Sequence, residues 1–328
     1  MSTPSQWLQI LADGRFHSGA ELGAAFGVSR AAVWKRLRQL RERYGLEVSA
    51  VRGRGYRLVR PFELLQPQAI EAQLAARVRD RVPCLDVLFE VDSTNRWMMG
   101  QAQHGAPSGQ VCFAEYQSGG RGRRGRRWSS PLGGNIYMSV LWRFANGASA
   151  VGGLSLVAGL AVVEALSKLG IDGLGLKWPN DIVWAERKLA GVLLELSGEA
   201  SGPCHVVIGV GLNVRLDSAA AADIDQPWVD LHQIGGSMPA RAVVAGAVLS
   251  RLVERLISFE SEGLASALMA WPRWDALHGR AITVWQGDQA IAGTALGVDE
   301  SGALLLQVSG GVRQFVGGEV SVRPATRG

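Results

Sequence analysis

Gln117-Ser118-Gly119-Gly120-Arg121-Gly122-Arg123-Arg124-Gly125-Arg126-Arg127-Trp128 is the most informative stretch of this chain. Five arginines fall within seven residues and are spaced by glycines. Glycine costs backbone entropy to order and neighbouring guanidinium groups repel one another, so the segment is not expected to order by itself. Arginine forks pair well with phosphate and carboxylate oxygens. We therefore expect the loop to close around an anionic ligand.

A solvated basic loop that touches nucleic acid nonspecifically is the alternative interpretation of this segment. Such a loop would be expected to carry several aromatic side chains for base stacking, and only Trp128 is present. A second motif, Lys177-Trp178-Pro179-Asn180-Asp181, follows downstream. Its presence favours a dedicated site over a nonspecific one.

Composition sets the class of the protein. A length of 328 residues predicts two or three domains, and an apolar fraction of 47% suffices for a packed core. Cys84, Cys112 and Cys204 lie far apart without a CxxC pair, and the five histidines show no HxxxH spacing. These patterns argue against a disulfide framework and a protein-bound metal. The most apolar run, 151–163, is too short for a membrane span, and no signal peptide opens the chain, so a cytoplasmic protein is expected.

The N-terminal region is basic. Residues 1–60 hold eleven Lys/Arg against four Asp/Glu, whereas the whole chain holds 34 against 29. Ser18 and Glu21 form a capping-box pattern for a helix to about residue 26, and Ser29 is placed to cap a second helix over 30–43. Two short strands, 46–51 and 56–59, follow around a basic glycine turn. The pattern predicts a winged helix-turn-helix.

A winged helix of this charge is expected to bind double-stranded DNA, with the second helix in a major groove and the wing on phosphates. One such module covers a half-site, so specific binding would need a dimer. The alternative is a winged helix that binds protein. The candidate DNA-binding residues are Ser29, Arg30, Lys35, Arg36, Arg38, Arg52 and Arg54.

The central region alternates strand and helix patterns and predicts a mixed sheet of α+β type. It lacks both GxGxxG and GxxxxGK[ST], which excludes the usual dinucleotide and P-loop sites. A strand over 84–91 ends in Asp92-Ser93-Thr94-Asn95. Hydroxyl and amide groups there suit a neutral polar head group such as a ureido ring, and plain helix capping by Ser93 or Asn95 is the alternative.

The C-terminal pattern changes at about residue 276. Short alternating strands over 281–285, 290–298, 303–308, 312–316 and 320–323 are separated by glycine turns. This spacing is typical of a small SH3-like β-barrel. We therefore expect three domains, at 1–62, 63–275 and 276–328.

Five motifs occur in a characteristic order: Ser93-Thr94-Asn95, the loop 117–128, Lys177-Trp178-Pro179-Asn180-Asp181, Arg187-Lys188-Leu189-Ala190-Gly191 and Gly209-Val210-Gly211-Leu212-Asn213. Together they resemble the bifunctional biotin protein ligases that are also biotin operon repressors. The likeness covers nearly the whole chain, and it implies a class II synthetase-like central domain. Gly119 departs from the family pattern, which usually has a small non-glycine residue there, and this should loosen the loop.

The resemblance implies two steps: biotin and ATP form biotinyl-5′-AMP, and a lysine of a biotin carboxyl carrier protein then takes the biotin. Magnesium would accompany ATP, and no protein metal site is expected. Ligand binding would favour a homodimer that binds the biotin operator. A biotin-sensing repressor without catalysis and a lipoate ligase are the alternatives.

The resemblance also assigns residues. Implied catalytic residues are Lys188, Arg123, Lys177 and Asp181, where Asp181 would either orient the incoming amine or bind magnesium. Implied biotin-binding residues are Ser93, Thr94, Asn95, Gln117, Arg121, Gly122, Arg123 and Lys188. Implied ATP and adenylate contacts are Trp128, Lys177, Asn180 and Asn213. Arg124, Arg126 and Arg127 are expected to face solvent or support the loop.

Overall fold

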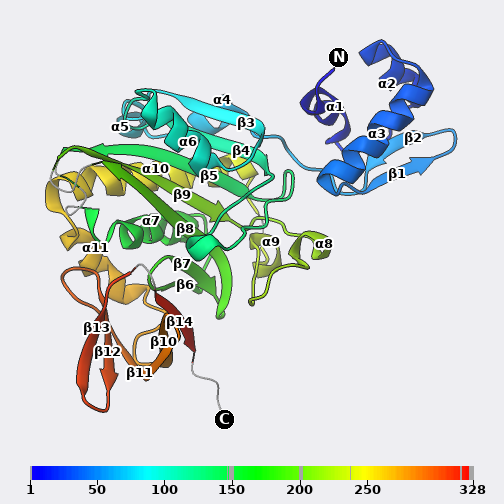
Figure 1. Ribbon diagram of the computed structural model, residues 1–328. Coiled ribbons are helices and arrows are strands. Elements are labelled where there is room, and N and C mark those ends of the chain that lie inside the picture. The colour runs from blue at the N-terminus through cyan, green and yellow to red at the C-terminus, as the bar shows by residue number, and fades with distance from the viewer. Residues whose placement is uncertain are drawn as a thin grey trace.

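The computed structural model describes residues 2–145, 147, 151–198, 202–236, 238–317 and 320–324. Three units follow one another along the chain, as Figure 1 shows. A small helical unit with a two-stranded ribbon stands at one side of a central sheet, and a second small sheet lies at the opposite end. The α+β class predicted from the sequence is confirmed.

The N-terminal unit is a winged helix-turn-helix. Its elements are α1 (Pro4–Leu11), α2 (Gly19–Phe26), α3 (Arg30–Tyr44), β1 (Val48–Val51) and β2 (Gly55–Leu58). The Ser18 side chain accepts from the Glu21 amide in a complete capping box, and the Ser29 side chain accepts from the Ala32 amide at the start of α3. Local capping therefore fixes both helix starts where the sequence predicted them.

Seven strands form the central sheet in the order β3-β4-β5-β9-β8-β7-β6. β3 and β4 are parallel, and the other neighbours pair antiparallel. Their bounds are β3 (Leu85–Val91), β4 (Val111–Gln117), β5 (Ile136–Phe144), β6 (Leu174–Lys177), β7 (Asp181–Trp184), β8 (Arg187–Gly198) and β9 (Cys204–Leu212). The crossover between the parallel strands is the helix α6 (Thr94–Gln103).

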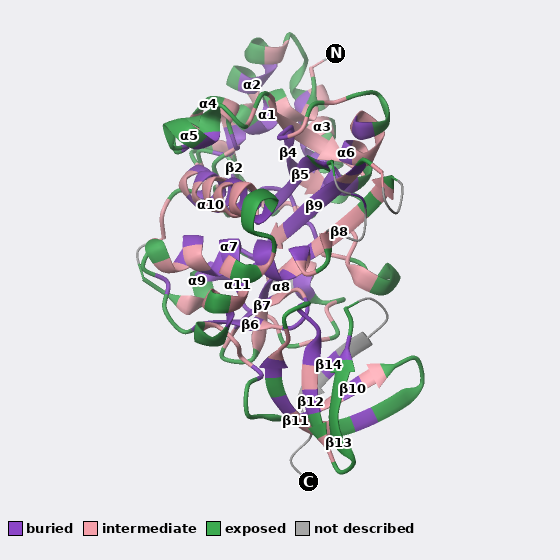
Figure 2. Ribbon diagram, turned by 90° about the vertical axis from the view of Figure 1, so that its left-hand side faces the viewer, coloured by how far each residue is buried: buried purple, intermediate pink, exposed green. Residues whose placement is uncertain are grey.

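Helices cover both faces of this sheet. α6 packs on one face through a small apolar cluster that includes Met98, Cys112 and Val207. The longer helices α7 (Leu154–Lys168) and α10 (Arg241–Glu262) pack on each other and on the opposite face, where they form the main core. Figure 2 shows that burial is strongest in β5 and β9, at the middle of the sheet. No helix in the described part of the chain is long and apolar enough to cross a bilayer.

The segment that leads from the winged helix into the central sheet holds two short helices. It forms α4 (Pro67–Glu71) and α5 (Ala76–Arg79), with Ala75 extended between them. A Cβ at Gly246 of α10 would lie 2.4 Å from the Cβ of Gln73, so α10 presses close against this bend. The remaining short helices are α8 (Ser218–Ala221), α9 (Leu231–Ile234) and α11 (Ala265–Ala270), with 3-10 turns η1 (Arg123–Gly125) and η3 (Trp271–Arg273).

The C-terminal unit is an antiparallel sheet in the order β13-β12-β11-β10-β14. Its strands are β10 (Ala281–Gln286), β11 (Gln289–Val298), β12 (Leu304–Val308), β13 (Gly311–Phe315) and β14 (Val320–Pro324). All five predicted strands are present. No pairing joins the outer strands β13 and β14 among the described residues, so the sheet is not closed into the expected barrel there.

Backbone hydrogen bonds attach this unit to the central sheet. Leu176 of β6 donates to Trp274 and accepts from Ala276, so the connecting segment lies along the outer edge of β6. The indole Nε1 of Trp178 donates to the carbonyl oxygen of Gly302 at 3.0 Å. The Lys177–Asp181 motif is thus bound both by the C-terminal unit and by the strands of the central sheet.

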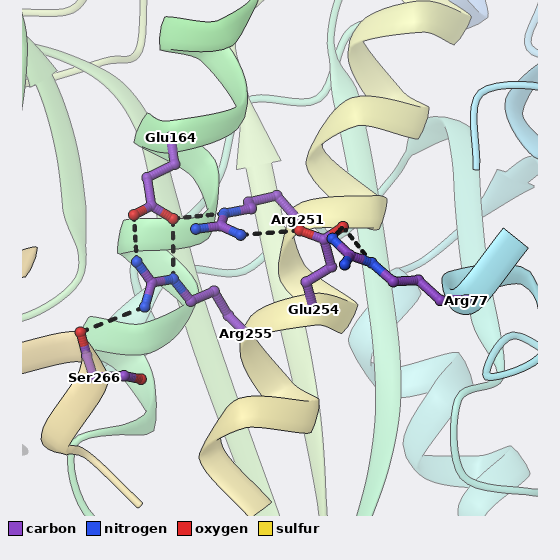
Figure 3. A network of polar contacts seen from close by, with 6 residues as sticks. All are labelled: Arg77, Glu164, Arg251, Glu254, Arg255 and Ser266. Atoms are coloured by element: carbon purple, nitrogen blue, oxygen red, sulfur yellow. Dashed lines mark hydrogen bonds and ion pairs between the residues drawn. The ribbon is translucent and has the colours of Figure 1, made fainter. Parts of the chain in front are cut away.

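An ion-pair network ties α7, α10 and α5 together (Figure 3). Glu164 accepts from Arg251 at 2.7 Å and from Arg255 at 3.0 Å, and Glu254 bridges Arg251 to Arg77. Burial alone would raise the pKa of Glu164, but the bonds from Arg255 and Arg251 outweigh it, and the pKa lies below its usual value of 4.5. The pKa of Glu254 is lowered in the same way.

A carboxylate with a depressed folded-state pKa stabilises the fold above its unfolded pKa and loses that contribution as pH falls through the folded pKa. We expect the free energy of unfolding to decline below about pH 4.3 and this decline to be shallower in Glu164→Gln. Urea titrations between neutral pH and pH 3 would measure it. Glu262→Gln, an exposed residue at the end of α10, is the control; an unchanged pH dependence in Glu164→Gln would contradict the prediction.

Candidate active site

One large cavity, of about 1540 Å³, lies between the central sheet and its neighbouring loops. Its wall extends from Gly45 at the end of α3 to Val322 in β14, so all three units contribute to it. Every residue that the sequence implicated in catalysis or in binding biotin and ATP lines this cavity, except Asn213. The motifs that are far apart in the sequence therefore meet at one place.

A buried polar network closes one end of the cavity. The Thr94 amide donates to Gln117 Oε1 at 2.9 Å, and the Thr94 hydroxyl donates to the same atom at 3.2 Å. Ser139 donates to Asn95 Oδ1 at 2.6 Å, and Asn95 Nδ2 donates to the Leu193 carbonyl. Ser93 stands at the N-cap of α6 but makes no side-chain capping bond. Helix capping, the alternative considered from the sequence, does not explain Ser93.

Gly209 makes room for this network. A Cβ at position 209 would lie 2.2 Å from Asn95 Oδ1, well inside contact distance. Asn95 cannot easily retreat because both ends of its amide are hydrogen bonded. The missing side chain at Gly209 therefore leaves space for the side chain of Asn95.

The arginine loop has an internal backbone structure. Gly122 donates to the Arg126 carbonyl at 2.7 Å, and Trp128 donates to Gly120 at 2.9 Å, around the short turn η1. These bonds supply local order that the glycine and arginine content did not predict. Arg124, Arg126 and Arg127 are exposed, as the sequence suggested.

The two inner arginines turn towards the sheet. Arg121 forms an ion pair with Glu195 at 2.7 Å, and Arg123 Nη1 donates to Asn180 Oδ1 at 3.0 Å. Burial lowers the pKa of Arg123, and the nearby Asp181 carboxylate partly offsets this effect. The loop thus divides into an inner pair with protein partners and an outer group in solvent.

Trp128 lies against the sheet where two glycines face each other. Gly191 of β8 and Gly211 of β9 are register partners. A Cβ on Gly211 would approach the indole to 2.5 Å, and a Cβ on Gly191 would approach it to 3.4 Å. Lys188 Nζ lies 5.4 Å from the centre of the same ring. The indole Nε1 is buried and has no hydrogen-bond partner among the described residues.

Lys188 is held beside Asp181 at the centre of the cavity wall. Its Nζ lies 2.6 Å from Asp181 Oδ1. Its backbone bonds to Pro227 and Val229, which anchors the start of β8. Asn180 is fixed by its amide bond to the Val192 carbonyl at 2.8 Å. Lys177 lines the same cavity.

Asn213 is buried outside the cavity. Its amide donates to the carbonyls of Val229 at 3.1 Å and Lys188 at 3.5 Å. It therefore supports the backbone of Lys188 and does not line the cavity with the other predicted site residues.

The described residues contain no group of three His, Cys, Asp or Glu side chains that could hold a metal ion. Asp181 is the carboxylate that stands among the cavity cations Lys188 and Arg123. A magnesium ion would therefore need most of its ligands from a nucleotide.

The predicted DNA-binding side chains lie on α3 and on the turn between β1 and β2. Arg30, Lys35, Arg38, Arg52 and Arg54 are exposed. Arg36 is half-buried and donates to the Ser2 carbonyl at 3.2 Å, so part of its hydrogen-bonding capacity is used within the protein. Ser29 is engaged in capping.

Comparison with known families agrees with this geometry. Residues 88–213 match the Biotin/lipoate A/B protein ligase family. Residues 5–57 match an HTH domain, and residues 277–323 match the Biotin protein ligase C terminal domain. The chain is 40% identical to the bifunctional ligase/repressor BirA of Escherichia coli over 326 residues, which is 99% of each protein. This chain belongs to the BirA family of bifunctional ligase/repressors.

Two further relatives support the family over the catalytic part. The biotin–[acetyl-CoA-carboxylase] ligase of Mycobacterium tuberculosis is 35% identical and is aligned over 69% of this chain and 84% of its own length. The Aquifex aeolicus biotin protein ligase solved with biotin and ATP superimposes with a TM-score of 0.64 at 30% identity. That superposition covers 74% of this chain and the whole of the other.

Several features of the site in this family member were not found from the sequence. Ser139 completes the polar network from the middle of β5, and Glu195 pairs with Arg121 from β8. On α3, Trp34 is 54% exposed and stacks with Arg38. Ser139 could have been found as a polar residue within an apolar strand. The pairing of Glu195 with Arg121 depends on strand register, and no sequence signal indicated it.

Gly209→Ala should destabilise the protein because the new methyl group would collide with the fixed Asn95 amide. Overpacking of this kind costs about 1–3 kcal/mol. Gly100→Ala is the matched control: position 100 lies within α6 with nothing within 4 Å of its Cβ, and there alanine should stabilise by about 0.5–1 kcal/mol. Urea unfolding of both variants measures the difference, and equal effects would refute this account of the site.

Proposed function

We propose that this protein is a biotin protein ligase and a biotin-responsive repressor of the biotin operon. It activates biotin with ATP to biotinyl-5′-AMP and transfers the biotin to a lysine of a biotin carboxyl carrier protein, in the cytoplasm. The observation that carries the proposal is a single cavity that joins a neutral polar end to the Lys188–Asp181 pair. The same chain carries a basic winged helix.

The neutral end would hold the ureido ring of biotin. Ser93, Thr94, Asn95 and Gln117 provide hydroxyl and amide groups without a formal charge, which suits an uncharged ring with donors and acceptors. Thr94 bonds to Gln117, and Asn95 bonds to Ser139, so Thr94, Asn95 and Gln117 are held in position before a ligand binds. Gly122, with Arg121 and Arg123, would cover the biotin tail.

The charged end would support adenylate formation. A biotin carboxylate oxygen attacks the α-phosphorus of ATP, a new O–P bond forms, and pyrophosphate leaves. Both reactants are anions, so cations must lower their repulsion and stabilise charge on the phosphoryl oxygens. Lys188, Arg123 and Lys177 fill that role. Magnesium bound to ATP would supply further positive charge, held mainly by phosphate oxygens with Asp181 as the available carboxylate.

Transfer uses the same wall of the cavity. The acceptor amine attacks the acyl carbon, the bond from that carbon to the AMP phosphate oxygen breaks, AMP leaves, and the proton lost by the amine passes to solvent. Asp181 either orients the incoming amine or contacts magnesium. Lys188 screens the negative charge on the phosphate of the departing AMP. Trp128 would offer its indole N–H, which is buried without a partner among the described residues, to the adenine. Asn180, which holds Arg123, would be a further adenylate contact. Asn213 acts indirectly by supporting Lys188.

The arginine loop would protect the intermediate. A mixed anhydride is destroyed by water, so a loop that excludes solvent preserves it for the acceptor. The inner arginines face the cavity, and their present partners Glu195 and Asn180 fix the loop near the sheet.

We assign three domains, 1–62 for DNA, 63–275 for catalysis and 276–328 as a C-terminal domain that supports ATP and acceptor binding. Ligand-dependent formation of a homodimer would place two winged helices on two half-sites of the operator. Ser29, Arg30, Lys35, Arg36, Arg38, Arg52 and Arg54 would form the DNA surface.

A repressor that senses biotin without catalysis is the second candidate. It would need the neutral end and the winged helix but not a lysine beside a carboxylate at the other end. The Lys188–Asp181 pair favours the ligase. A lipoate ligase would also fit the central family match, but the HTH domain and the Biotin protein ligase C terminal domain flank it here.

Incubation with labelled biotin, ATP, magnesium and a biotin carboxyl carrier domain should label that domain, and substitution of its acceptor lysine should abolish labelling. Lys188→Met should slow biotin-dependent pyrophosphate exchange about 100-fold or more, because a cation is lost beside the reacting groups. Lys168→Met, at the exposed end of α7, is the control. Biotin binding without exchange or labelling by the wild-type protein would favour the sensor instead.

DNA binding by the winged helix should depend steeply on salt. Lys35→Ala or Arg52→Ala should each reduce the slope of log affinity against log salt concentration by about 1, because each removes one phosphate contact. Arg36→Ala should reduce it less, since Arg36 already bonds to Ser2. Fluorescence anisotropy with a random-sequence duplex measures the slope. Equal slopes for wild type, Lys35→Ala and Arg52→Ala would show that α3 and the wing do not contact DNA.

A further inference from the structure

The C-terminal end of α3 is docked on the central domain. Tyr44, the last residue of the helix, is only 5% exposed, and its hydroxyl donates to Glu90 Oε2 at 2.8 Å. Arg43 Nη2 donates to the other oxygen of the same carboxylate at 2.6 Å. Glu90 belongs to β3, so one carboxylate on the central sheet receives two adjacent side chains of the DNA-binding helix.

Aromatic packing surrounds this polar contact. The Tyr44 ring meets Phe89 edge-on at 5.6 Å between centroids and Tyr116 at 5.2 Å. These rings belong to an apolar cluster that continues from the core of the winged helix to Leu132 of the central domain. The Arg43 side chain is 61% exposed, so its ion pair is screened by solvent and contributes little. The buried Tyr44 ring is therefore the main element of the contact.

The hydroxyl of Tyr44 remains a donor under ordinary conditions. Burial, followed by the hydrogen bond and the charge of Glu90, raises the pKa of Tyr44 well above its usual value. Burial would raise the pKa of Glu90, but the bonds from Arg43 and Tyr44 outweigh it and lower that pKa. The Tyr44–Glu90 hydrogen bond is thus intact at neutral pH.

This contact lies next to the neutral end of the cavity. In the parallel pair β3–β4, Glu90 is opposite Tyr116, and Val91 is opposite Gln117. Tyr44 therefore packs on the register pair directly before Gln117, whose Oε1 receives both Thr94 bonds. Arg43, Tyr44 and Gly45 also form part of the cavity wall itself.

We propose that Tyr44 is a positioning residue for biotin, so that the DNA-binding helix and the biotin end of the cavity are coupled within one protomer. The inference rests on the proposed biotin-binding function. Tyr44 supports the ends of β3 and β4 through Glu90 and Tyr116, and these strand ends lead directly to Ser93 and Gln117. Displacement of α3 removes that support, and by reciprocity a ligand that binds Ser93 and Gln117 in their present positions favours the docked helix.

This route differs from dimerisation. A dimer arranges two winged helices relative to each other, whereas the Tyr44 contact sets the orientation of one winged helix on its own catalytic domain. A monomer alone should therefore show the coupling. The hydrogen bond to Glu90 fixes the orientation of the winged helix at this interface, and the aromatic contacts provide most of the binding energy.

The test is biotin binding to the full chain, without ATP, by titration calorimetry at protein concentrations where sedimentation confirms monomers. Tyr44→Ala should weaken biotin binding about tenfold, within the usual range for coupled sites. Tyr44→Phe keeps the ring and should stay within about threefold of wild type. At saturating biotin, the KM for ATP in pyrophosphate exchange should be unchanged in both variants, because the charged end of the cavity is not supported by Tyr44.

Phe26→Leu is the matched control for winged-helix stability, since Phe26 of α2 stacks on Trp7 inside the unit at 4.1 Å. It should lower thermal stability without weakening biotin binding. Wild-type affinity in Tyr44→Ala would overturn the inference while leaving the proposed function standing. Equal weakening by Phe26→Leu would also overturn it, because general loosening of the winged helix would then suffice. No biotin binding by wild type would instead defeat the proposed function.

Discussion

The site depends on three places where the central sheet carries no side chain. Gly191 and Gly211 face each other on β8 and β9, and Gly209 lies two residues before Gly211 on β9. The indole of Trp128 lies over the first pair, and the Asn95 amide lies over Gly209. Because these side chains approach the backbone so closely, the arginine loop and the start of α6 are both brought onto the sheet. Between them they enclose the space that Lys188 and Asp181 face.

Charge pairing explains how so many cations remain in one cavity. An unpaired buried charge is costly, and the cavity offers each inner cation a partner on a neighbouring strand or motif. Glu195 holds Arg121, Asn180 holds Arg123 and Asp181 holds Lys188. A phosphate or carboxylate ligand would compete with Glu195 and Asp181 for these cations. The outer arginines lie in solvent, where their repulsion is screened.

Local chemistry made much of the fold predictable. The caps at Ser18 and Ser29 decide the helix starts within a few residues, and the glycine turns separate all five C-terminal strands. What depended on distant partners was not predictable. The helix α10 was not predicted from the sequence. The bend before α5 lies where Gln73 packs closely against Gly246 of α10. Asn213 follows a motif strand, yet its amide turns away to the backbone of Lys188 and Val229.

The candidate site shows the same division. The family resemblance carried by the motifs indicated which side chains would lie together, and all of them except Asn213 line one cavity. Sequence did not reveal which of them pair in the protein, since Glu195 reaches Arg121 across 74 positions and Ser139 reaches Asn95 across 44. Such pairings follow from strand order in the sheet, where β5, β9 and β8 are neighbours although β8 and β9 come later in the chain.

The terminal units therefore act on the catalytic cavity as parts of its wall. The Trp178 indole bonds to Gly302 of the C-terminal unit, and this bond fixes the motif that carries Asn180 and Asp181. Tyr44 reaches the opposite end through Glu90. Beneath the connection to the winged helix, the buried Arg241 pairs with Glu115 and also donates to the Glu63 carbonyl, so the linker itself is bound to the sheet. A chain tied down in this way cannot move its winged helix freely, and any motion that DNA binding requires must change contacts near Gln117.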